Sequence, residues 1–150
     1  MSREHDKGMS LIVKTITRLT VGVIFLYGIY IVTHGHLSPG GGFAGGVIIA
    51  LAFIHLILAY GKEVAFKKLS QAASSLWEST GAILFLTIAL LGFTGGYFFL
   101  NFLPKGEPFK LFSAGIIPLC NIAISFKVGA GIFAIFVALI LLKLDLGKKK

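Results

Sequence analysis

One glycine-rich stretch lies between two long apolar runs and reads His34-Gly35-His36-Leu37-Ser38-Pro39-Gly40-Gly41-Gly42-Phe43-Ala44-Gly45-Gly46. Five of its last seven residues are glycine. Irregular backbone survives at membrane depth only where protein covers it or water reaches it. The stretch therefore predicts a tight turn between two helices that packs against other protein, or a loop that lines a path for ions or water. Glycines spaced four apart, such as Gly42 and Gly46, also allow a close helix contact.

The composition of the rest of the chain is that of a membrane protein. Of its 150 residues, 56% are hydrophobic and only 13% are charged, and the mean hydropathy is +0.91. A net charge of +8 suggests nucleic acid binding in a soluble chain. Here the basic residues lie in short segments between apolar runs, as they do in the loops of membrane proteins. We therefore expect no nucleic acid partner.

The apolar runs predict an all-α integral membrane protein with four transmembrane helices in a single domain, 1–150. A helix needs about 20 apolar residues to cross the hydrocarbon core. Trp77 and the capping-box pattern Ser75 to Glu78 place the start of the third helix, and Pro104 places its end. The predicted spans are residues 12–33, 43–60, 79–103 and 117–142, and residues 61–78 are predicted to form a cytoplasmic loop.

The positive charges orient these spans. With four spans, eleven Lys and Arg residues share one side with both termini, and only Lys105 and Lys110 lie on the other. Basic loops stay in the cytoplasm. A fifth span would divide the last apolar run into halves too short to cross the membrane. The sequence thus predicts a multi-pass protein of the plasma membrane with both termini in the cytoplasm.

Lys127 is the one formal charge inside the predicted bilayer core, about ten residues into the last helix. A charge at that depth costs at least about 2.5 kcal/mol unless it is paired or hydrated. With Glu78 placed in the cytoplasmic loop, we expect its partner to be another subunit or water. Lys127 then lies on a path for protons or cations, or forms a structural ion pair. His55 is a second candidate, either as a proton relay or as a hydrogen-bonding partner of a neighbouring helix.

No metal or cofactor site is expected in this chain. A single cysteine, Cys120, excludes a disulfide and a four-cysteine cluster within the chain. His34 and His36 provide at most half of a zinc site. No lysine followed by serine or threonine comes after the glycines, as a phosphate-binding loop requires.

The glycine-rich stretch carries a family resemblance. From Gly35 to Gly46 it resembles the signature Gly-His-x-x-Pro-Gly-Gly-Gly-Phe-x-Gly-Gly of the B subunit of Mrp-type multisubunit sodium/proton antiporters. The chain length, the four spans and the place of the motif agree with that family. The last span, with Lys127, is more similar to the homologous subunits of archaeal membrane-bound hydrogenase and sulfane sulfur reductase complexes.

The resemblance implies a non-catalytic accessory subunit of an antiporter module, beside larger subunits that hold the main ion pathways. The implied partners are those membrane subunits, hydrogenase-like or iron–sulfur peripheral subunits in a respiratory complex, and membrane lipid. It also implies that the motif shapes a hairpin at a subunit interface. The motif residues are Gly35, His36, Pro39, Gly40, Gly41, Gly42, Phe43, Gly45 and Gly46.

Two other functions remain. The chain is either a purely structural scaffold of a free-standing antiporter, with no ion path of its own, or a small homodimeric drug/proton exchanger. The latter needs a carboxylate within the membrane. The predicted spans contain none, which disfavours the exchanger.

Overall fold

The computed structural model describes residues 9–61, 71–111 and 113–148. Four helices in it are long and apolar enough to cross a membrane. The predicted all-α fold with four membrane-spanning helices is therefore confirmed. The elements, in chain order, are α1 (Leu11–His34), α2 (Gly42–Tyr60), α4 (Gln71–Leu91), the short 3-10 helix η1 (Gly92–Gly95) and α5 (Ile117–Lys148).

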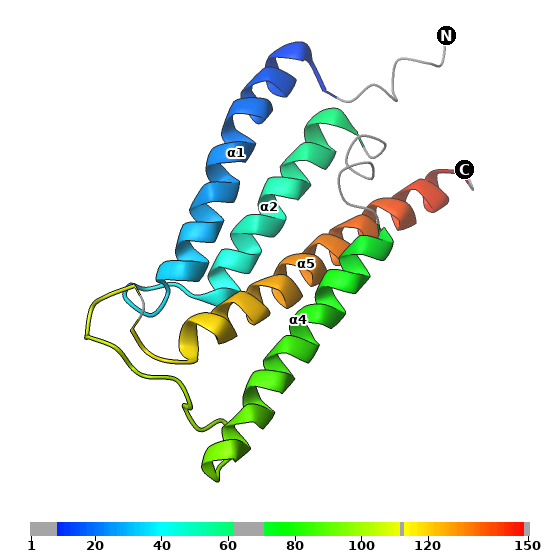
Figure 1. Cartoon of the computed structure of the whole chain (residues 1–150). Coiled ribbons are helices and arrows are strands. Elements are labelled where there is room, and N and C mark those ends of the chain that lie inside the picture. Colours follow the sequence, from blue (N-terminus) through cyan, green and yellow to red (C-terminus); the bar gives the residue numbers. More distant parts are fainter. Residues whose placement is uncertain (1–8, 62–70, 112, 149–150) are drawn as a thin grey trace.

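The helices stand in a row rather than in a closed bundle. Helix α2 packs against α1 on one side and α5 on the other, and α4 packs extensively against α5 alone among the described helices. Figure 1 shows this order, α1–α2–α5–α4, and shows the start of α1 and the end of α5 on the same side of the row. Helix α4 therefore keeps most of its surface free of contact with the rest of the described chain.

The core lies between α2 and α5. Ile57, Phe133 and Val137 are buried there, and Phe53 and Phe136 pack around them. Many larger apolar side chains face outward instead; Leu19 and Leu26, for example, are 71% and 67% exposed. This arrangement is expected of helices whose outer faces meet lipid or other membrane subunits.

The third helix differs from the prediction of 79–103. Helix α4 begins at Gln71, and regular structure ends with η1 at Gly95. The predicted loop 61–78 was therefore wrong for residues 71–78, whereas residues 62–70 lie outside the described part of the chain. Of the polar residues there, Ser74 and Glu78 contact α5 from within the helix, whereas Ser75 is exposed.

The early end of the third helix has a local cause. Gly96 adopts the left-handed conformation, with φ of 103°, which ends the helix. The chain then folds back, and the Phe99 N–H donates to the Ala89 carbonyl at 3.2 Å. Residues 97–103 carry no charge and, apart from Asn101, are apolar or aromatic, so the prediction from hydropathy continued across this turn. Elsewhere, α1 and α2 cover 12–33 and 43–60 to within one residue, and α5 continues beyond 142.

Candidate functional site

The glycine-rich stretch forms the hairpin between α1 and α2. Gly41 has a φ of 122°, a conformation that side chains other than glycine rarely adopt. The next residue begins α2, and the Gly42 N–H donates to Oδ1 of Asn121 on α5 at 3.2 Å. The motif therefore fixes the start of α2 against α5.

The glycines that follow bring α2 close to both of its neighbours. A Cβ on Gly46 would lie 2.9 Å from the Ser125 carbonyl oxygen of α5. Gly45 faces Gly28 and Val32 of α1 in the same way. The helices that approach the motif closely thus belong to this chain. Phe43 points outward and is 66% exposed, so it is available to a neighbouring subunit.

The two histidines of the hairpin have partners within the chain. His34 Nδ1 lies 3.0 Å from the Ser38 hydroxyl, and His36 Nε2 lies 3.4 Å from the Lys110 carbonyl oxygen. His36 thus connects the hairpin to the segment that precedes α5. Over the described residues, no group of three or more His, Cys, Asp or Glu side chains is placed to hold a metal ion.

An ion pair joins the two helices α4 and α5. Lys127 Nζ lies 3.7 Å from Oε1 of Glu78, and both residues lie inside spans long enough to cross the membrane. The expectation that no acid of this chain reaches Lys127 was therefore wrong. The cause is the early start of α4, which places Glu78 within the helix rather than in a loop.

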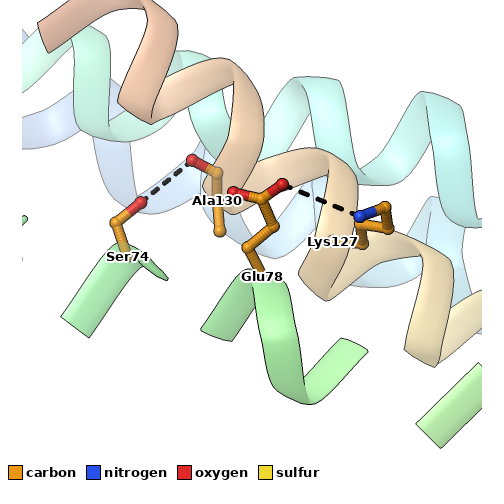
Figure 2. A network of polar contacts seen from close by, with 4 residues as sticks. All are labelled: Ser74, Glu78, Lys127 and Ala130. Carbon is orange, nitrogen blue, oxygen red and sulfur yellow. Dashed lines mark hydrogen bonds and ion pairs between the residues drawn. The ribbon is translucent and has the colours of Figure 1, made fainter. Parts of the chain in front are cut away.

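Small residues on α4 bring this pair together. Ser74, Glu78 and Gly81 follow the i, i+4, i+7 spacing of one helix face. The Ser74 hydroxyl donates to the Ala130 carbonyl oxygen at 2.9 Å, and a Cβ on Gly81 would lie 2.7 Å from the Lys127 backbone nitrogen. Figure 2 shows Ser74 and Glu78 directed from α4 toward Ala130 and Lys127 of α5. We call this contact the α4–α5 seam.

The ion pair is loose and open to one side. Its N–O separation of 3.7 Å exceeds the 2.7–2.9 Å of a charge-assisted hydrogen bond. The Lys127 and Glu78 side chains remain 55% and 42% exposed. A charged group of this kind within the membrane faces protein or water rather than lipid. Chemically, the pair offers a carboxylate acceptor and an ammonium donor side by side on one open flank.

The other side of the α4–α5 seam is apolar. There the rings of Trp77 and Phe126 lie 5.0 Å apart. They border a hollow of about 330 Å³ between α4, α5 and the first two helices. Its other lining residues are Phe25, Ile29, Ile49, Phe53, Ser125, Gly129 and Ala130. Charge and aromatic side chains thus occupy opposite flanks of the same helix contact.

The sequence-predicted site residues do not form one cluster. His55 is exposed on α2, whereas the Lys127 side chain on α5 pairs with Glu78 of α4. Glu78 is the residue that sequence reasoning missed. The signal that would have found it is the spacing of Ser74, Glu78 and Gly81, which marks a helix face with room for close packing.

The glycine hairpin and the four-span fold agree with a known family. A sequence profile described as "Domain related to MnhB subunit of Na+/H+ antiporter" matches residues 12–134. The chain belongs to the MnhB family. The resemblance predicted from the motif is thereby confirmed, and the match covers all four membrane-spanning helices up to the middle of α5.

Two relatives and one solved structure are similar to this chain. "Uncharacterized protein MJ1307" of Methanocaldococcus jannaschii is 38% identical over 121 residues, covering 70% of this chain and 42% of that protein. "Putative antiporter subunit mnhB2" of Staphylococcus aureus strain Newman is 38% identical over 67 residues, or 45% of each chain. A chain in the structure of the membrane-bound sulfane sulfur reductase, an archaeal respiratory membrane complex, superposes with a TM-score of 0.74.

That structural match has 32% identity and covers 85% of this chain and 56% of the other. This MnhB-family chain thus spans about half the length of the relatives that it matches. The family and the fold are therefore shared, whereas the activity and the partners of a whole relative belong to that relative.

Proposed function

We propose that this chain is an accessory membrane subunit of an Mrp-type sodium/proton antiporter module. The observation that carries the proposal is the MnhB-family match across residues 12–134. The structural likeness to a chain of the archaeal sulfane sulfur reductase complex supports a place in an energy-converting respiratory complex. The proposed partners are antiporter-module membrane subunits and hydrogenase-like or iron–sulfur peripheral subunits, and the redox chemistry belongs to those partners.

The proposed setting is the plasma membrane, with both termini in the cytoplasm. The start of α1 and the end of α5 lie on the same side of the helix row (Figure 1). Among the described residues, Lys14 and Arg18 lie near the start of α1, and Lys143 and Lys148 lie near the end of α5, in agreement with the positive-inside rule. In this orientation the glycine hairpin lies at the external side.

The Glu78–Lys127 pair is the proposed contribution of this chain to the ion path. Protonation of Glu78 removes the countercharge of Lys127, and deprotonation restores it. When Glu78 takes up a proton from the open flank, Lys127 loses its countercharge and releases its own proton onward. The proton on Glu78 then passes to Lys127, which restores the pair. His55, exposed on α2, remains a second proposed proton relay, separate from this pair.

The scaffold hypothesis makes a different prediction for the same pair. Lys127→Arg keeps the positive charge, but arginine does not release its proton in proteins. If the lysine relays protons, the assembled complex loses sodium-driven proton movement in membrane vesicles. If the chain is only a scaffold, vesicles with Lys127→Arg or His55→Phe retain exchange. Native gels of the same membranes establish that the complex has assembled in each variant.

A drug/proton exchanger can no longer be disfavoured by the absence of a carboxylate within the membrane. Glu78 lies within a span, so the predicted lack of a membrane carboxylate was wrong. Family membership now distinguishes the two functions, because the match is to an antiporter subunit. A tagged chain that purifies only as a homodimer would favour the exchanger.

A further inference from the structure

The Lys127 ammonium group lies on the open flank of the α4–α5 seam without a hydrogen-bond acceptor in the described part of the chain. In the part of the chain that the structure describes, the contact of the Lys127 ammonium group is with Glu78 at 3.7 Å, beyond hydrogen-bonding distance. A lysine ammonium group carries three donors. Within the hydrocarbon region, lipid tails offer no acceptor to meet them.

The surface around the pair is suited to a second helix. On α5, Lys127, Gly131, Ile135 and Ala138 fall within about 80° of one another at 3.6 residues per turn. We call these four residues, with Glu78 beside them, the charged strip. Ile135 is 64% exposed, and Ala138 is also exposed. Gly131 lacks a side chain, and a Cβ there would lie 3.9 Å from the Glu78 carboxylate, so the carboxylate can be approached from this side.

The exposed charge of Lys127 and the small side chains beside it indicate what kind of partner binds the charged strip. Small residues at a helix surface allow another membrane helix to approach closely. An unmet ammonium donor requires that this helix carry an oxygen acceptor at the same depth. We propose that the charged strip is the docking site for a transmembrane helix of another subunit, which places a carboxylate, amide or hydroxyl oxygen against Lys127. This inference rests on the proposed function, since it requires a multisubunit complex.

Photo-crosslinking in the intact complex tests this docking site. The photoreactive residue p-benzoylphenylalanine replaces Ile135 in the tagged full-length chain, and membranes are irradiated before extraction. Mass spectrometry then identifies each adduct. The expected product joins this chain to a different membrane subunit. An adduct with a second copy of this chain, or with lipid only, would overturn the proposal.

A neutral double variant separates docking from simple charge burial. Glu78→Gln with Lys127→Met removes both charges, and replacing an ion pair by neutral groups often leaves folding intact. If a partner helix recognises the pair, the double variant still inserts in membranes but its Ile135 adduct falls to background. If the adduct persists at the original yield, the pair takes no part in docking and the proposal fails.

A matched control changes a polar residue whose side chain hydrogen-bonds only within its own helix. The Thr87 hydroxyl donates to the Ile83 carbonyl oxygen within α4 at 2.8 Å, so Thr87→Val should leave the adduct unchanged. Sodium/proton exchange by the unmodified complex is measured separately. If exchange depends on this chain but no Ile135 adduct with another subunit forms, the docking site is refuted. The proposed function is then unaffected.

Discussion

Helix α5 makes two contacts of different character, one with α2 and one with α4. The α2–α5 contact is formed by glycines, by a core of Ile57, Phe133 and Val137, and by the Asn121 hydrogen bond. The α4–α5 seam has a buried serine, a glycine and a half-exposed ion pair. The first contact is complete within the chain, whereas the second leaves charge open on one flank. We conclude that the first maintains the fold and that the second connects the fold to its surroundings.

The largest expected effect comes from filling the α2–α5 contact. Gly42→Leu places a branched side chain against Asn121 and Ile124 of α5. Backbone cannot move aside as a flexible side chain can, so the cost exceeds the usual 1–3 kcal/mol of overpacking. We expect little folded chain and no assembled complex on a native gel. Gly22→Leu is the control, because a Cβ at Gly22 has no atom within 4 Å; equal losses from both variants would contradict the comparison.

The next largest effect is expected from adding a side chain in the α4–α5 seam, which leaves the α2–α5 contact unchanged. Gly81→Ala puts a Cβ 2.7 Å from the Ala123 carbonyl oxygen and the Lys127 nitrogen, which forces α4 away from α5. We expect a cost of about 1–3 kcal/mol and a strong loss of sodium/proton exchange, because Glu78 moves away from Lys127. The α2–α5 contact should survive, so the chain should still be found in membranes. Exchange at the normal rate in assembled complexes would show that the pair distance is unimportant.

A smaller effect, on stability alone, is expected at the start of α2. Asn121→Ala removes the acceptor of the Gly42 N–H, and an unsatisfied buried donor costs about 1–3 kcal/mol. Unfolding of the purified chain by sodium dodecyl sulfate in mixed micelles measures the change. Asn121→Asp keeps an acceptor oxygen at the same place and should retain more stability than alanine. The reverse order would mean that this hydrogen bond does not hold the hairpin.

The smallest effect is expected at Ser74. Ser74→Ala deletes the hydroxyl that donates to the Ala130 carbonyl oxygen. Hydrogen bonds between membrane helices contribute about 0.6 kcal/mol on average, and the carbonyl keeps its helical partner. The same unfolding measurement should therefore show a shift smaller than that of Asn121→Ala. A larger shift would place the stability of the fold in the α4–α5 seam rather than in the α2–α5 contact.

Hydropathy and glycine spacing predicted the four-span fold well, because both report local physics. Apolar length sets a membrane span, and glycines at 41, 42, 45 and 46 mark a close approach. The ends of the third helix were not predictable in the same way. Its polar start is stabilised by contacts with α5, and its apolar continuation is stopped by the left-handed turn at Gly96.

The candidate site was predictable only in part. Lys127 is conspicuous in sequence because charge is rare inside an apolar run. Glu78 could not be predicted as a residue within a span, because a glutamate among serines at the polar end of an apolar run is typical of a loop. Its role depends on the antiparallel register of α4 and α5, which brings residues 49 positions apart within 3.7 Å. The spacing of Ser74, Glu78 and Gly81 marks the packing face of α4, but no local pattern encodes which residue of α5 meets it.

Purification of the intact complex tests the central claim most directly. The tagged chain is extracted in mild detergent and separated on a native gel, and every co-migrating chain is identified by mass spectrometry. We predict large multi-span antiporter subunits, accompanied by iron–sulfur or nickel–iron proteins. A homodimer of this chain without other subunits would contradict the account.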